Sequence, residues 1–319
     1  MIEHHEGGSV RSRVVGVGSR VVLRSVLGFW PVTGPLAPAM RLIDLGAKAV
    51  PGLRSVSCDR VQGDGWHGDL FRPQGVDRGD AAIVYFHGGA FLFAGIATHR
   101  RLAERLALET GRPVLSVAYR HLPHTTVAGS VEDAVSAVNW LLDNGYDASR
   151  LIVAGDSAGG HLAFVVARTA AEHGLRLGGL VAISPWLEFD NTERRLHRNA
   201  WRDPMIPTFR LDRIAQHVVG SNVVDPELSP MNQRVDDLPP TMLIASGSEV
   251  LLHDAEKMER QLDDAGVPVE LHVWPGQVHC FPVLAHLLPE SRAAIDLMSS
   301  FVVAVVGRAE SAGDAVIAS

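Results

Sequence analysis

Ser157 stands in the stretch Gly-Asp-Ser-Ala-Gly, residues 155–159, where its hydroxyl could serve as a nucleophile. The stretch has the G-x-S-x-G pattern, follows the apolar run LIVAG at 151–155, and precedes a run of small residues with helical character. A strand, a strained turn and a helix in this order lift a serine Oγ above the strand ends. The next N–H, that of Ala158, then lies at a helix N-terminus and faces a developing oxyanion. We predict Ser157 as the nucleophile and Ala158 as an oxyanion donor; the alternative is a glycine-rich turn with an incidental serine.

The stretch HGGAF, residues 87–91, follows another short apolar run and supports the same chemistry. Two consecutive glycines let a ligand approach closely and can present backbone N–H groups to an oxyanion. The sequence therefore predicts oxyanion donors at Gly88 and Gly89. We expect His87 to orient this loop by hydrogen bonding rather than to act as a base.

These motifs together resemble the hormone-sensitive-lipase family of α/β-hydrolases, with the bacterial esterases as the nearest match. The resemblance rests on HGGAF, on Tyr119 and Arg120 after the next strand, on GDSAGG, and on a late acid and histidine, and it covers nearly the whole chain. It implies carboxylic ester hydrolysis of a small molecule through a Ser–acid–His triad without a cofactor or a metal. Two positions depart from the family pattern: Ala90 replaces a third glycine, and the stretch after the strand reads YRHLPH (119–124).

The general base is expected late in the chain, because these hydrolases place their triad in the order serine, acid, histidine. The stretch VELHVWPGQVHCF, residues 269–281, contains two of the 15 histidines. His272 falls inside a strand pattern, whereas His279 follows a Pro-Gly turn and matches the family's histidine. We predict His279 as the base; His286 is a weaker candidate, and His4, His5 and His253 lack a suitable position.

Two acids compete for the third place in the triad, and both lie in the stretch SGSEVLLHD, residues 246–254. Glu249 follows the end of a predicted strand, in the loop where the family carries its acid. Asp254 stands where a helix begins, and an acid there is also explained by helix capping and the helix dipole. We therefore predict Glu249 as the triad acid, with Asp254 as the alternative.

The elements needed to position these residues alternate along the chain. The sequence predicts strands at 81–87, 113–119, 151–155, 179–185, 241–247 and 267–275, with helices between them, at 254–265 and at 289–307. This order indicates an α/β fold with a mostly parallel sheet covered by helices on both faces. We expect a hydrolase core at 51–185 and 239–310, an N-terminal cap segment at 1–50, a cap insertion at 186–238, and a fraying tail at 311–319. Three aromatic residues follow strand ends and could line an acyl pocket or belong to the core: Phe91, Phe93 and Trp186.

The composition is that of an ordinary globular protein, with 319 residues, 46% hydrophobic and 20% charged residues and a net charge of −7. No basic stripe indicates a nucleic-acid partner. Cys58 and Cys280 are the only cysteines, so no disulfide framework and no CxxC motif is present, and HExxH is also absent. A homodimer is left open.

The N-terminal 40 residues contain arginines, an apolar stretch and the sequence APA at 37–39. A secretory signal needs an unbroken apolar run. Here charged residues and prolines interrupt it, at Arg20, Arg24, Pro31, Pro35 and Pro38. We therefore expect no signal peptide and a cytoplasmic protein. A basic face with Arg13, Arg20 and Arg24 could contact an anionic membrane, but a cap helix is the favoured role.

Other readings of the same motifs stay open at this point. Plant gibberellin receptors resemble this family but lack the triad histidine, so a non-catalytic ligand-binding protein is one alternative. Retention of both Ser157 and His279 favours an enzyme. The same triad also serves lactone and amide hydrolysis, and short to medium acyl chains are a further expectation.

Overall fold

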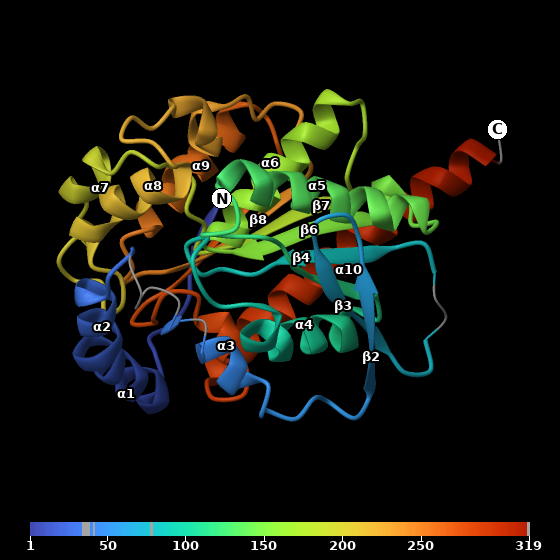
Figure 1. Ribbon diagram of the computed structural model, residues 1–319. Coiled ribbons are helices and arrows are strands. Elements are labelled where there is room, and N and C mark those ends of the chain that lie inside the picture. Colours follow the sequence, from blue (N-terminus) through green and yellow to red (C-terminus); the bar gives the residue numbers. More distant parts are fainter. Residues whose placement is uncertain (34–38, 41, 77–78, 318–319) are drawn as a thin grey trace.

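The computed structural model describes residues 1–33, 39–40, 42–76 and 79–317. In that part of the chain, nine strands form one sheet in the order β1-β9-β8-β7-β6-β4-β5-β3-β2. Figure 1 shows this sheet between two layers of helices. The predicted α/β class with a mostly parallel sheet is confirmed.

The six predicted strands form the centre of the sheet and run parallel to one another. Their bounds agree with the sequence patterns to within two residues: β4 (Ala82–Phe86), β5 (Val114–Ala118), β6 (Leu151–Asp156), β7 (Gly179–Ile183), β8 (Thr241–Ser246) and β9 (Val269–Trp274). The central strands read as nearly continuous apolar runs because helices cover both faces of the sheet. Their carboxyl ends lie at one edge of the sheet, where the loops of the predicted site begin.

Three further strands, which the sequence patterns did not predict, precede the run at 81–87. β2 (Val56–Gln62) and β3 (His67–Pro73) form an antiparallel hairpin whose β3 pairs with β5 at one side of the sheet. β1 (Ile2–His4) pairs in parallel with β9 at the other side. β1 and most of β2 are exposed edge strands, so they lack the apolar runs that revealed the others.

Two helices cover one face of the sheet, α4 (Ile96–Thr110) and α10 (Pro289–Ile317). Three cover the other face, α5 (Val127–Asp143), α6 (Ala158–Glu172) and α9 (Leu252–Asp264). Each layer buries its own apolar cluster against the sheet. The tail expected to fray continues α10 as far as Ile317.

The N-terminal segment and the segment at 186–238 lie next to each other beyond the sheet, at the left of Figure 1. The N-terminal segment holds α1 (Val10–Gly18), a π-helical turn η1 (Ser19–Leu23), α2 (Arg24–Phe29) and α3 (Leu42–Ala47). The later segment holds α7 (Thr192–Leu196), η4 (Thr208–Arg210), α8 (Leu211–Val219), η5 (Pro226–Leu228) and η6 (Pro230–Asn232). Two other short helical turns lie outside both segments, η3 (Ala148–Arg150) and η7 (Phe281–Leu284).

Arginines join these two segments. Arg24 Nη1 donates to the carbonyl oxygens of Asp203 and Ile206 at 2.6 and 2.7 Å, and Arg20 donates to the carbonyl of Arg202. Two arginines of the predicted basic face therefore bind the chain itself. Among the described residues, no helix is long and apolar enough to cross a bilayer. Of the APA sequence, only Ala39 belongs to the described part of the chain.

Candidate active site

Ser157 lies in a strained turn between β6 and α6. Its backbone has φ 53° and ψ −115°, a conformation that an L-residue rarely adopts. The two flanking glycines are required by close packing. A Cβ at Gly159 would lie 1.9 Å from the carbonyl oxygen of Phe86, and one at Gly155 would lie 2.2 Å from the carbonyl oxygen of Gly159. Ala158 is the first residue of α6, where a backbone N–H has no partner within the helix.

Asp156, directly before the serine, holds the surrounding loops together. Its buried carboxylate accepts hydrogen bonds from Tyr85 Oη at 2.7 Å and from Gly88 N at 2.9 Å, and it lies 3.2 Å from His99 Nε2. Burial alone would raise the pKa of Asp156, but the charge of His99 and these hydrogen bonds lower it to about 2. The carboxylate is therefore ionised and positions both the serine turn and the HGG loop.

The HGG loop, residues 87–89, leaves fewer backbone N–H groups free for an oxyanion than predicted. The N–H of Gly88 already donates to Asp156, so the expectation that Gly88 holds the oxyanion is not met. Gly89 has φ 117°, and a Cβ there would lie 1.9 Å from the carbonyl oxygen of Phe93. Ala90, at the position of the family's third glycine, adopts a left-handed φ of 54°. Gly89 and Ala158 remain as the two predicted donors whose N–H groups make no other hydrogen bond within the described residues.

His87 has the orienting position that the sequence predicts for it. Its Nδ1 lies 2.7 Å from the carbonyl oxygen of Gly88, and its ring stacks on Tyr119 with centroids 4.5 Å apart. The hydroxyl of Tyr119 donates to the carbonyl oxygen of His87 at 2.7 Å. Burial and the neighbouring His99 lower the pKa of His87 to about 3, so it stays neutral in physiological conditions.

Glu249 and His279 form a close pair. Glu249 Oε2 lies 2.5 Å from His279 Nδ1, and the glutamate side chain is fully buried. In the tautomer that donates from Nδ1 to this carboxylate oxygen, Nε2 keeps its lone pair. Burial would lower the pKa of His279, but the hydrogen bond and charge of Glu249 raise it above its ordinary value of 6.5.

The serine and the histidine are not joined by a hydrogen bond. No hydrogen bond between Ser157 Oγ and His279 Nε2 is present; Nε2 instead lies 3.2 Å from Cys280 Sγ. Catalytic hydrogen bonds of this kind often tighten only when substrate binds. Burial, followed by the charges of Asp156 and Glu249, raises the pKa of Cys280 well above 9, so its thiol stays protonated and is a poor nucleophile.

Asp254 has a different set of partners from Glu249. Its carboxylate pairs with the guanidinium of Arg194 at 2.8 and 2.9 Å, and it accepts a backbone hydrogen bond from Leu187 at 2.8 Å. Both charged side chains are almost completely buried. Asp254 therefore joins the segment after β7 to α9. The sequence indicated helix capping for this acid and did not predict this role.

Several buried polar residues that the sequence did not single out hold the acid in place. Ser184 Oγ and the backbone N–H of Ser246 both donate to Glu249 Oε1 at 2.7 Å. Asn199 Nδ2 donates to the carbonyl oxygen of Glu249 at 2.9 Å, and Asp203 accepts from the N–H of Val250 at 2.7 Å. No motif marks these residues, because strand pairing and the folding of the insertion bring them together.

An apolar cavity of about 220 Å³ lies where the N-terminal segment, the HGG loop and α8 meet. Phe93 and Leu92 line it, together with Trp30 from the N-terminal segment and Ile214 from α8. The other two aromatic candidates lie elsewhere: Phe91 and Trp186 are buried within the hydrophobic core.

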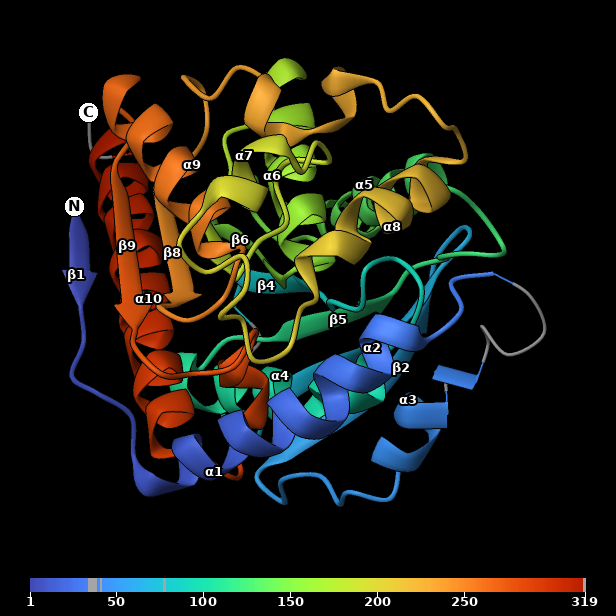
Figure 2. The same cartoon turned by 90° about the vertical axis from the view of Figure 1, so that its left-hand side faces the viewer.

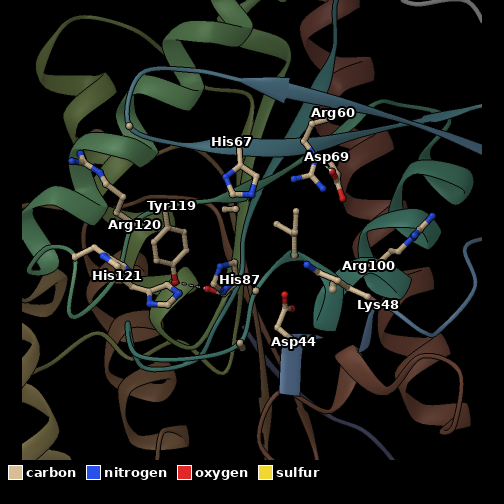
Figure 3. Close-up of a pocket in the computed structure, with 17 residues that line it drawn as sticks. Asp44, Lys48, Arg60, His67, Asp69, His87, Arg100, Tyr119, Arg120 and His121 are labelled. Atoms are coloured by element: carbon tan, nitrogen blue, oxygen red, sulfur yellow. Dashed lines mark hydrogen bonds and ion pairs between the residues drawn. The ribbon is translucent and has the colours of Figure 1, made fainter. Parts of the chain in front are cut away.

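A second, polar cavity of about 570 Å³ lies beside the β2–β3 hairpin, which contributes Arg60, His67 and Asp69 to its lining (Figure 3). It reaches the HGG loop through His87 and Tyr119, and none of Ser157, Glu249 and His279 lines it. Most of its cationic side chains are engaged in ion pairs: Arg60 with Asp69, Arg100 with Glu104 and Arg120 with Asp133.

Comparison with known proteins identifies the family. Residues 83–283 match a family model described as the alpha/beta hydrolase fold. The chain belongs to the α/β-hydrolase fold family. Its curated relatives include esterase LipU of Mycobacterium tuberculosis, which is 39% identical over 73% of this chain and 82% of the relative. Carboxylesterase/phospholipase LipF of the same organism is 33% identical over 93% of this chain and 82% of the relative.

Solved structures agree with this assignment. An esterase of the bacterial hormone-sensitive lipase family superposes with a TM-score of 0.83 and 29% identity, over 93% of this chain and 99% of that one. The esterase EstE5 superposes with a TM-score of 0.81 and 28% identity, over 92% of this chain and 98% of that one. The predicted family and the predicted enzyme class, a carboxylesterase- or lipase-type hydrolase, are thereby confirmed for this α/β-hydrolase.

Proposed function

We propose that this α/β-hydrolase cleaves carboxylic esters with Ser157 as nucleophile, His279 as base and Glu249 as acid. The observation that carries the proposal is the buried Glu249–His279 pair, 2.5 Å apart, in the loops beside the strained turn of Ser157. The backbone N–H of Cys280 donates to Ser184 Oγ, and Ser184 Oγ donates to Glu249, which ties the histidine loop to the acid.

The reaction follows from this arrangement. His279 Nε2 takes the proton of Ser157 as Oγ attacks the ester carbonyl carbon, and Glu249 stabilises the imidazolium. The N–H groups of Gly89 and Ala158 bind the oxyanion of the tetrahedral intermediate. The intermediate collapses to an acyl-enzyme as His279 returns the proton to the leaving alcohol. A water molecule, deprotonated by His279, then attacks the acyl carbon. The bond to Ser157 Oγ breaks as His279 returns the proton to Oγ, and the carboxylic acid is released.

We propose short to medium acyl chains as substrates, with the apolar cavity beside Phe93 as the acyl pocket. Its volume of about 220 Å³ suits a chain of a few methylene groups better than a long fatty acid. The N-terminal segment at 1–50 and the insertion at 186–238 both contribute to its walls and are proposed to form the cap. Related chains include an ethyl acetate hydrolase of Pseudomonas putida, 33% identical over 70% of this chain.

A panel of p-nitrophenyl esters from acetate to palmitate tests the activity and the chain length together. We expect kcat/KM to fall for long chains, and Ser157→Ala to lose at least about 10³-fold in activity. Ser300→Ala, an exposed serine on α10, is the matched control and should keep full activity. Equal activity of wild type and Ser157→Ala would overturn the nucleophile, whereas a preference for palmitate would overturn only the chain length.

The alternatives are separated by two further measurements. A fluorophosphonate probe should label wild type and not Ser157→Ala, whereas a non-catalytic ligand-binding protein would remain unlabelled. Lactones and amides with the same acyl groups should be cleaved more slowly than the esters; a faster rate on either would reassign the substrate class while keeping the triad.

A further inference from the structure

Three potential metal ligands meet at the edge of the sheet where β1 lies beside β9, shown at the left of Figure 2. Glu3 of β1 is paired in register with His272 of β9. His5 follows Glu3 by two positions, and its N–H donates to the carbonyl oxygen of Val273 at 2.9 Å, so it extends the same pairing. Because side chains alternate along a strand, Glu3 and His5 face the same side, and His4 faces the other.

The distances between the donor atoms resemble the edges of a coordination polyhedron. His5 Nε2 lies 3.0 Å from His272 Nδ1, and Glu3 Oε2 lies 3.4 Å from the same nitrogen. One donor atom from each residue lies within 4.8 Å of the other two. Bonds of about 2.0–2.1 Å to a common metal ion place neighbouring ligand atoms about 2.9 Å apart in an octahedron and about 3.4 Å apart in a tetrahedron.

Neighbouring side chains pack against the two imidazole rings. The His5 ring stacks on Trp274, with centroids 3.8 Å apart and an interplanar angle of 7°. His272 is 4% exposed, and its second nitrogen, Nε2, lies 3.7 Å from a carboxylate oxygen of Glu270. Ligating histidines usually have a carboxylate or carbonyl group near the other ring nitrogen.

We infer that Glu3, His5 and His272 form a binding site for a first-row divalent transition metal such as Zn²⁺, which fastens β1 to β9. Two imidazoles and one carboxylate suit Zn²⁺, Co²⁺ and Ni²⁺, whereas Mg²⁺ and Ca²⁺ prefer oxygen ligands alone. The Glu3 side chain is 61% exposed, so water can complete the coordination. The site takes no part in the proposed ester cleavage. It stabilises the fold, since a ligand that binds only the native state shifts folding toward it.

Calorimetric titration of the metal-free, untagged protein with Zn²⁺ tests the site, with Co²⁺ absorption as a second measure of geometry. We expect one equivalent of Zn²⁺ to bind and to raise the melting temperature. His5→Ala and Glu3→Gln should each weaken binding by more than about tenfold, since even the loss of a residue that only supports a ligand costs about 10–100-fold. His4→Ala is the matched control and should bind as wild type does.

The titrations either support the metal site or overturn it. Loss of binding in His5→Ala with retention in His4→Ala supports it. It is overturned by a wild type that binds no Zn²⁺, or by equal affinities in wild type and His5→Ala. It is equally overturned if His4→Ala weakens binding as much as His5→Ala does. Melting temperatures measured without metal show whether each variant is folded before the titration.

Discussion

Replacement of Glu249 by glutamine tests which of the two acids in the SGSEVLLHD stretch, Glu249 or Asp254, belongs to the proposed triad. The glutamine keeps the size of the side chain and can keep the oxygen that accepts from Ser184 and from the N–H of Ser246. Its NH₂ group then faces His279 Nδ1, where the carboxylate oxygen lay 2.5 Å away. An amide nitrogen only donates, so the imidazole must move its proton from Nδ1 to Nε2. The base then presents a hydrogen atom, rather than a lone pair, to the serine.

The expected loss is large because two contributions disappear together. The wrong tautomer and the missing stabilisation of the imidazolium cost about 10⁴-fold in kcat in a serine protease triad with the equivalent acid-to-amide change. We expect Glu249→Gln to lose about 10³–10⁴-fold in kcat on p-nitrophenyl butyrate, with a smaller change in KM. The fold should remain, since no buried cation loses its partner.

Asp254→Asn is the matched control, five positions later in the same stretch. It leaves the buried guanidinium of Arg194 without a full counter-charge, which costs about 3 kcal/mol or more of stability. We expect a clear fall in melting temperature and a kcat within about tenfold of wild type below the transition. Steady-state rates and thermal unfolding of both variants, measured in one buffer, provide the comparison. A Glu249→Gln enzyme with more than a tenth of wild-type kcat, beside a folded and inactive Asp254→Asn, would refute the assignment.

The remaining predictions concern pH and packing. The acidic limb of kcat/KM should lie above pH 6.5, because Glu249 raises the pKa of His279 and the protonated base cannot accept a proton; a limb below that value would contradict the pairing. The pKa of Asp156 in the folded state is about 2, below its ordinary 3.8, so its stabilisation of roughly 2 kcal/mol is present above pH 3.8 and lost toward pH 2. Asp156→Asn should therefore flatten the dependence of melting temperature on pH in that range. Gly159→Ala should cost about 3 kcal/mol, because its Cβ would meet a backbone carbonyl, whereas Gly16→Ala, with open space around it, should be neutral or stabilising in thermal unfolding.

The parts of the fold that sequence reasoning predicted are those whose burial leaves a clear pattern. β6 and β8 are buried at every position, so their apolar runs identified them. The serine turn was equally predictable, because the G-x-S-x-G pattern between a strand and a helix marks it in the sequence. The contact of Gly159 with Phe86 of β4 appears only in the fold. β2 shows the opposite case. Four consecutive residues of this strand, Ser57 to Arg60, are exposed and form no apolar pattern, so the strand is recognised only by its pairing with β3.

The site was predictable only as far as chain order and local motifs determine it. The loop after a strand end favoured Glu249 over Asp254, but the burial of both acids and the contact of Glu249 with a histidine 30 residues later depend on the folded chain. The use of the Gly88 N–H by Asp156 depends on a contact across 68 residues. The sequence shows that Cys280 follows His279. It does not show that the Cys280 thiol contacts His279 Nε2, because that contact depends on the left-handed backbone at Cys280.

The pairing of β1 with β9 also has a consequence for the order of folding. His5 and His272 are 267 residues apart, and within the described residues β9 is the one strand neighbour of β1. Among the described strands β1 is synthesised before the others, yet its place in the sheet does not exist until β9 has emerged and paired with β8. Contacts of such high sequence separation form late, because closing the long intervening loop costs entropy before it gains any contact. Of the described strands, we therefore expect β1 to be made first and to join the sheet last.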